Sequence, residues 1–312
     1  MNGKKIYYLE TNALYSLANY LGVIAEKVEA HTSLFAIQEI VSQIDEENYC
    51  KRKSVLSKLR SSNLKIMPYL PKEMAMLAFR LNISELDQIK HEKSFLWNQA
   101  MLVCSSSSYD EYCEKAKKTY NFDVKDSKEI EDAYDKKATT GIHEEIYKET
   151  QKIKARRKKE KEICQKYGVK SLSELPLSPP IEGVEYVTID VDRLFLDEKN
   201  VPEREEDIRD IKELAQKMLH HLGIACDEVE LDKLVRNRNK ERLTAFILGN
   251  LSYCFSEIFG GKTPKRNDAI DLCHLIYLEN ENYVIVSDDK IFESCTMPQM
   301  HIKATELKTL CE

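Results

Sequence analysis

The 312-residue sequence lacks any apolar run near the roughly 20 residues that a membrane-spanning helix needs. Its first residues, MNGKKIYYLETNALYSL, lack the apolar core and small-residue cleavage site of a signal peptide. The nine cysteines contain no C-x-x-C pair, a usage typical of reduced thiols and unfavourable for a structural zinc site. We therefore expect a cytoplasmic protein with no membrane partner.

The sequence also lacks an excess of positive charge. Its formal net charge is −6, so there is no global attraction to nucleic acid, and a polyanionic partner would need a local basic patch. Hydrophobic residues make up 42% of the chain, which is enough to build a substantial core. The length allows one large domain or two ordinary ones.

Helix-breaking residues are scarce in the middle of the chain. Residues 72–175 contain no proline, and their only glycines are Gly141 and Gly168. Together with abundant Glu, Lys, Leu and Ala, this predicts long helices. Further along, we expect a break at 172–183 and a short strand at 184–196. Two amphipathic helical stretches are expected after it, at 203–224 and 227–259. Residues 70–261 thus form a predicted, mainly α-helical insert.

The two ends of the chain instead alternate between strand and helix patterns. Strands are expected at 5–10, 63–69, 282–289 and at the start of 300–310. Helical spacing occurs at 13–28, 32–44, 265–281 and in the rest of 300–310. Such alternation favours a central, mostly parallel sheet with crossover helices. We expect one α/β domain built discontinuously from residues 1–69 and 262–312.

Acidic residues follow two of these predicted strands. Glu10 ends the first strand, and Asp288 and Asp289 end the strand at 282–289. Ligand sites of open parallel sheets form beyond the carboxyl ends of the strands, so these acids are expected to face one crevice. Asp268 and Asp271, three residues apart, share one face of a predicted helix. Clustered carboxylates are costly unless a cation neutralises them, and Mg²⁺ or Mn²⁺ prefers such oxygen ligands.

Four short motifs follow one another along the chain: YLETNAL at 8–14, SLFAIQE at 33–39, DLCHL at 271–275 and SDDKIF at 287–292. In this order they resemble the motifs of the PIN-like nuclease family. The resemblance covers about 120 residues and implies a three-layer α/β/α sandwich. It also implies a divalent-metal-dependent ribonuclease in which four carboxylates hold one or two ions. These are Glu10, Glu39, Asp271 and Asp289.

The resemblance further implies positioning roles for Asn12 and Ser287, and it leaves Asp288 either a supporting or a solvated role. Each acid also has a plainer interpretation. Glu10 is suited to cap the following helix, and Asp268 is equally suited to be an N-cap or a further ligand. Glu39 and Asp271 are alternatively solvated helix residues, although Glu39 lies in a mostly apolar stretch.

His274 has two readings as well. It lies three residues after Asp271, where a general base would be useful. Its helical neighbours Leu272, Leu275 and Ile276 have a core-like pattern, so a packed structural histidine is the favoured interpretation.

Basic residues cluster inside the insert. Residues 148–161 contain Arg156, Arg157, Lys158 and Lys159, and residues 236–242 contain Arg236 and Arg238. A solvated helix face is the plain reading of both clusters. The functional reading is a phosphate-tracking surface that would lead RNA to the acidic site.

Three functions therefore compete. The first is an endoribonuclease, the second a DNA nuclease with the same core motifs, and the third a PIN-like scaffold that has lost catalysis. Glu10 favours the scaffold, because the family has Asp there and Glu is one methylene longer. The sequence leaves open whether a second copy of the chain or an inhibitor protein is a further partner.

Overall fold

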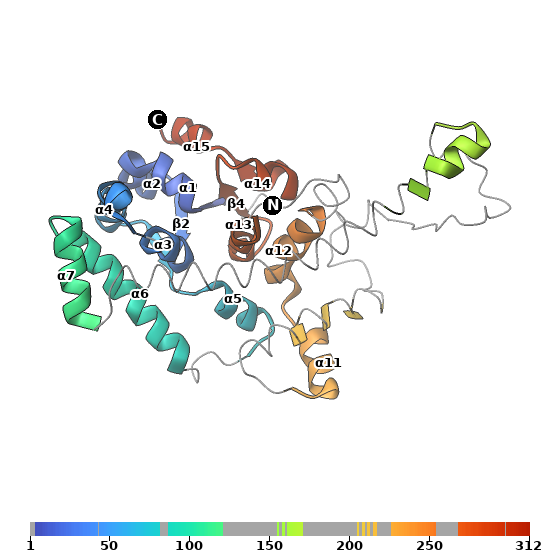
Figure 1. Ribbon diagram of the computed structural model, residues 1–312, viewed down its shortest axis with the longest axis horizontal. Helices are drawn as coiled ribbons and strands as arrows, with labels where there is room; N and C mark the ends of the chain where they lie inside the picture. Colours follow the sequence, from blue (N-terminus) through green and yellow to red (C-terminus); the bar gives the residue numbers. More distant parts are fainter. Residues whose placement is uncertain are drawn as a thin grey trace.

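The computed structural model describes residues 4–42, 44–81, 87–120, 155, 158–159, 161–170, 205, 208–209, 211–212, 215–216, 226–253, 268–296 and 298–312. Within them, five strands form one parallel sheet, of which β2 and β4 are labelled in Figure 1. The strands are β1 (Ile6–Leu9), β2 (Glu29–Ser33), β3 (Lys65–Met67), β4 (Tyr283–Val286) and β5 (His301–Ile302). The chain is therefore an α/β protein with a parallel sheet, as the sequence predicts.

The strand order is β3-β2-β1-β4-β5. From β1 the first part of the chain builds the sheet in one direction, and β4 and β5, from the other end of the sequence, extend it in the other direction. The register pairs Leu9 of β1 with Val286 of β4. The order thus reverses between β1 and β4, which is where open α/β sheets form their ligand crevices.

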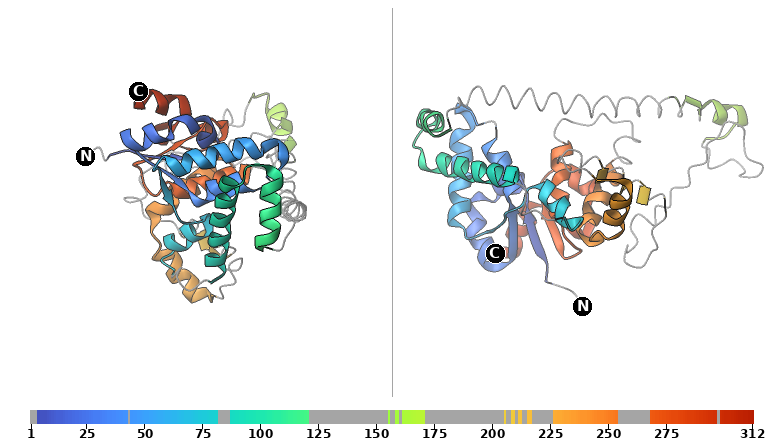
Figure 2. Two further views of the ribbon diagram at one scale, coloured as in Figure 1. Left: turned by 90° about the vertical axis from the view of Figure 1, so that its left-hand side faces the viewer. Right: turned by 90° about the horizontal axis from the view of Figure 1, so that it is seen from below.

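Helices cover both faces of this sheet (Figure 2). Before β4 the helices whose bounds are defined are α1 (Thr11–Ser16), η1 (Ala18–Tyr20), α2 (Leu21–Lys27), α3 (Leu34–Val41), α4 (Glu46–Ser61), α5 (Pro71–Ala78), α6 (Asp87–Ser105), α7 (Tyr109–Tyr120), α11 (Glu228–Arg236), α12 (Lys240–Tyr253), α13 (Asp268–Cys273) and η4 (His274–Tyr277). After β4 they are α14 (Lys290–Cys295), η5 (Pro298–Met300) and α15 (Ala304–Cys311).

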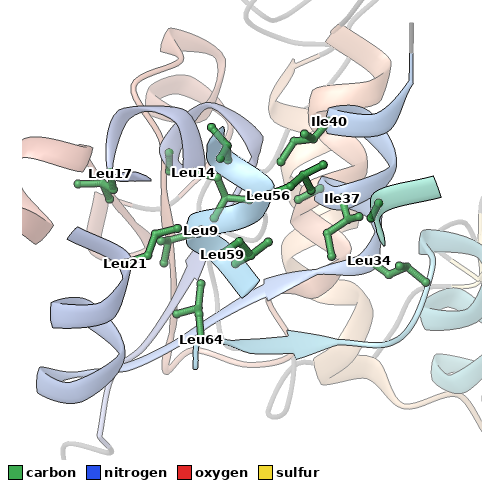
Figure 3. Close-up of a cluster of buried hydrophobic side chains, with 14 of the residues drawn as sticks. Leu9, Leu14, Leu17, Leu21, Leu34, Ile37, Ile40, Leu56, Leu59 and Leu64 are labelled. Carbon is green, nitrogen blue, oxygen red and sulfur yellow. The ribbon is translucent and has the colours of Figure 1, made fainter. Parts of the chain in front are cut away.

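Alternate residues of the central strands point to opposite faces. Tyr7 and Leu9 enter a hydrophobic cluster with α1 to α4, α6, α7 and α15, part of which is drawn in Figure 3. Tyr8 and Ile285 enter a second cluster with α5, α11, α12, η4 and α14. Burial on both faces explains why β4, with the sequence YVIV, is continuously apolar.

Helices from the 70–261 range thus contribute to both clusters. Gly249 of α12 shows how closely one of them packs on the sheet domain, because a Cβ there would meet the Leu275 side chain and lie 2.9 Å from the carbonyl oxygen of Cys295. Helix α12 therefore lies directly against η4 and α14, and η4 directly follows the helix that carries Asp271.

The secondary-structure elements expected from the sequence can be compared with those of the structure. The strands expected at 5–10, 63–69, 282–289 and 300–310 are found as β1, β3, β4 and β5. The helical stretch expected at 32–44 is wrong at its start, because residues 29–33 form β2 and the helix begins only at Leu34. The strand expected at 184–196 and the break at 172–183 lie outside the described residues. Across the part of the chain that is described, no helix has the length and apolar character to cross a membrane.

Candidate metal and nuclease site

The carboxyl ends of β1 and β4 place Glu10 beside Ser287. Each follows its strand directly, and the two strands are neighbours. The Ser287 side chain is fully buried and hydrogen-bonds to the Glu10 carboxylate. Its Oγ also accepts the backbone N–H of Asp289 at 3.0 Å. Ser287 therefore links the ends of the two strands, and its positioning role at a catalytic site stays a prediction.

Glu10 is buried and is the N-cap of α1. Its Oε1 accepts the backbone N–H of Ala13 at 2.8 Å, and its Oε2 accepts that of Asn12 at 2.6 Å. Burial raises the pKa of Glu10, while His274 and the two N–H groups oppose that rise. The capping interpretation is thus confirmed. Capping does not use the full acceptor capacity of the carboxylate, because each oxygen has a second lone pair.

Glu39, on α3, is held from two sides. The Thr11 hydroxyl donates to its Oε2, and the same oxygen lies 2.7 Å from Nε2 of His274. Both contacts come from other segments of the chain, so the carboxylate has a fixed direction. The plain interpretation of Glu39 as a solvated residue does not describe these contacts.

His274 is buried between Glu39 and Tyr8. Its Nδ1 lies 2.7 Å from the Tyr8 hydroxyl, which is in turn 2.8 Å from Oγ of Ser33, the N-cap of α3. Burial alone would lower the pKa of His274, but Glu39 and the other nearby carboxylates raise it above its usual range. His274 is therefore a packed histidine, as the pattern of its neighbours predicts, and it also contacts the Glu39 carboxylate.

Asp271, on α13, faces the other acids. Its pKa is raised to about 7 by burial first, and then by the charges of Asp289, Glu39 and Glu10, with His274 opposing them. The three acids therefore act on Asp271 as like charges, which disfavour its ionised form. Asp271 is therefore the member of the group whose charge is least compensated.

Cys273, two residues along, is not a candidate nucleophile. Its thiol is buried near Glu39 and Asp271, and burial with these charges raises its pKa to about 11. The thiol is thus protonated at neutral pH and unreactive.

Asp289 and Asp288 have different surroundings. The Asn12 side-chain amide donates to Oδ2 of Asp289, a contact expected of a group that positions a carboxylate. Asp288 accepts the Ser16 hydroxyl at 3.1 Å and the backbone N–H of Ala304, at the start of α15, also at 3.1 Å. Asp288 therefore joins α1 to α15 while its side chain remains exposed, so these contacts do not decide between the supporting and the solvated role.

The structure brings together Glu10, Glu39, Asp271 and Asp289 but gives Asp268 a separate contact. Asp268 accepts a hydrogen bond from the hydroxyl of Tyr253 on α12. Neither of the two interpretations of Asp268, as an N-cap and as a ligand, is decided by this contact.

The predicted basic surface is only partly described. Arg156 and Arg157 lie outside the described residues, whereas Lys158 and Lys159 are exposed and helical. Arg236 is exposed but forms ion pairs with Asp232 and Glu205. Arg238 is buried and donates through Nη1 to the Val235 carbonyl at 2.8 Å, so its charge is not displayed on the surface. An RNA-binding role for these side chains stays a prediction.

The donor chemistry of the four carboxylates fits a hard divalent cation, since all are oxygen ligands and their repulsion leaves Asp271 undercompensated. Among the residues that the structure describes, however, no group of three or more His, Cys, Asp or Glu side chains is placed to hold an ion.

Two contributors to the site were missed by sequence reasoning. Thr11 lies inside the quoted ETN motif, but its contact with Glu39 depends on α1 and α3 packing together. Tyr8 reads as a core aromatic, and its alternation in β1 gives no sign of its bond to His274.

No protein-family model, curated protein or solved structure matches this chain.

Proposed function

We propose that this protein is a divalent-metal-dependent endonuclease of the PIN-like type, and that its substrate is RNA. The observation that carries the proposal is the gathering of four carboxylates, from four separate segments, near the carboxyl ends of β1 and β4. They are Glu10, Glu39, Asp271 and Asp289.

The place of this cluster supports a catalytic site over a structural one. It lies where the strand order reverses, at the carboxyl ends of two neighbouring parallel strands. A structural cluster of acids would be expected to be neutralised by basic partners. Here His274 lowers the pKa of both Glu10 and Asp271, but burial and, for Asp271, the neighbouring acids outweigh it, so both pKa values stay raised.

The four carboxylates would hold Mg²⁺ or Mn²⁺. Such an ion polarises a phosphodiester, lowers the pKa of a bound water and stabilises the leaving oxygen. The protein supplies the orientation. Thr11 and His274 fix the direction of Glu39, and Asn12 fixes that of Asp289. A nearby cation would also lower the pKa of Asp271, so that this carboxylate is ionised at neutral pH.

A scaffold without catalysis is the second candidate. It is favoured by one observation: Glu10 and Glu39 already have structural roles, as a helix cap and as the partner of a buried histidine. In a scaffold these roles alone would account for the two acids.

Cleavage of labelled RNA and DNA, with Mg²⁺ or Mn²⁺, separates these candidates. We expect metal-dependent cleavage of RNA, and a loss of at least about 10³-fold in the variant Asp271→Asn/Asp289→Asn, corresponding to about 4 kcal/mol of transition-state stabilisation. The matched control, Glu281→Gln/Glu306→Gln, removes two charges from exposed positions and should cleave normally.

Three other outcomes are informative. Cleavage that survives in Asp271→Asn/Asp289→Asn would place the active site elsewhere. Cleavage of DNA but not RNA would make the protein a DNA nuclease. A wild-type protein that cleaves neither substrate with either metal would support the scaffold.

A further inference from the structure

A pocket of about 560 Å³ opens beside the carboxylate cluster. It is lined by Asn12, Tyr15, Ser16, Asn48, Lys51, Arg52, Asp288 and Asp289. We call it the α1–α4 pocket, because most of these residues come from those two helices. Asp289 and Asn12 belong both to the pocket and to the carboxylate site, so a ligand in the pocket would touch the site directly.

The two walls of the pocket carry opposite charge. Asp288 and Asp289 form the acidic wall after β4, and Lys51 and Arg52 of α4 form the basic wall. The polar side chains of Asn12, Ser16 and Asn48 also line the pocket. A ligand that fits both walls must have an anionic group for α4 and a second part suited to the carboxylate site.

Both cations of the basic wall are held by the fold. Nζ of Lys51 lies 4.8 Å from the ring centroid of Tyr15, a cation–π distance. Nη1 of Arg52 donates to the carbonyl oxygens of Glu39, at 3.0 Å, and of Ile40, at 2.8 Å. Arg52 thus fixes α4 against α3, the helix that carries Glu39. The basic wall therefore has a fixed position relative to the carboxylates.

A basic wall would help a nucleic-acid strand to bind beside the carboxylates. Carboxylates that hold a metal repel the phosphates on either side of the scissile one, and fixed cations nearby offset that repulsion. The volume lies within the 300–1,000 Å³ typical of small-ligand pockets, so a single nucleotide is a reasonable occupant. A lone strand can place one nucleotide in such a pocket, whereas a duplex keeps its bases paired.

We propose that the α1–α4 pocket is a substrate subsite that binds one nucleotide of single-stranded RNA next to the scissile phosphate. Lys51 contacts its phosphate, and Arg52 adds positive charge to the same wall. The subsite rests on the proposed nuclease function for its biological meaning, but its affinity for RNA is measurable without cleavage.

The test is the binding of a labelled single-stranded RNA to the full chain, with divalent metal removed by a chelator. Lys51→Gln should raise the Kd about 3- to 10-fold and lower the salt dependence of binding by about one unit in slope, because one phosphate contact is lost. Lys51→Arg, which keeps the charge, should restore most of the affinity.

Arg60→Gln is the matched control. Arg60 is exposed on the same helix, nine residues further along. Nine residues correspond to about 14 Å of helix and half a turn of rotation, so Arg60 lies on the opposite face of α4. Its loss changes the net charge as much as that of Lys51 but should leave the Kd nearly unchanged.

The outcomes separate the subsite from the nuclease. Equal Kd values for Lys51→Gln and Arg60→Gln would overturn the subsite, even if the wild-type protein cleaves RNA. A selective effect of Lys51→Gln in a protein that cleaves nothing would uphold the subsite and reject the nuclease. Absence of RNA binding by the wild-type protein would also overturn the subsite.

Discussion

The two halves of the carboxylate cluster differ in how far hydrogen bonds and ion pairs compensate their negative charge. Glu10 and Glu39 are built into the fold, the first as the cap of α1 and the second as the partner of His274. Asp271 instead faces three other carboxylates, and its pKa is raised to about 7. We call Glu10 and Glu39 the rigid half, because their contacts fix the position of the site. We call Asp271 the repulsive half, because the repulsion that it experiences is relieved when a cation is bound.

The repulsive half predicts that Asp271→Asn stabilises the metal-free protein. A folded-state pKa above the ordinary value means that the folded state keeps a proton that the unfolded chain has lost. Wild-type stability therefore falls as the pH rises from about 4 to about 7. At pH 8 the variant should be more stable by roughly 1–3 kcal/mol, and its advantage should vanish near pH 4.

Urea unfolding of both proteins between pH 4 and pH 8, with metal chelated, measures this effect. Asp288→Asn serves as the control, because it weakens a contact with the start of α15 and should destabilise by about 0.5–1 kcal/mol. An Asp271→Asn variant that is destabilised at pH 8 would mean that the cluster is not repulsive.

The rigid half predicts a smaller change of opposite sign. Glu39→Gln removes the carboxylate that does most to raise the pKa of His274, so that pKa should fall. A histidine whose folded-state pKa is raised stabilises the protein below its unfolded-state pKa, and this contribution is lost as the pH rises through the folded-state value. The variant should therefore be less stable by about 1–2 kcal/mol near pH 6, and the difference should shrink at higher pH.

An NMR titration of the histidine ring, combined with urea unfolding at pH 6 and pH 8, checks this prediction. An unchanged His274 pKa in Glu39→Gln would show that the ion pair does not orient the carboxylate. Equal destabilisation at the two pH values would point to lost packing as the cause.

The sequence identified the two central strands and the acids that follow them, for physical reasons that are local. IYYL and YVIV are dense in β-forming residues, and the acids after them interrupt apolar runs. The order of four motifs then added Glu39 and Asp271. The sequence was least informative wherever tertiary contacts decide the outcome.

Strand β2 is the clearest such case. Its sequence, EAHTS, has little β propensity, yet it pairs with β1 on one side and β3 on the other. The hydrogen bonds to two neighbours override the local preference. The same holds for Lys51 and Arg52, which look like part of a solvated helix and become a pocket wall only when α4 packs against α1 and α3.

The most direct test of the account is a calorimetric titration of Mn²⁺ into the full chain at pH 6 and pH 8, in buffers of different ionisation enthalpy. We expect binding that is tighter at pH 8, releases a proton near neutral pH as Asp271 ionises, and is lost in Asp271→Asn/Asp289→Asn. Binding that is absent in the wild-type protein, or that is unchanged in this variant, would contradict the assignment of the carboxylate cluster as a metal site.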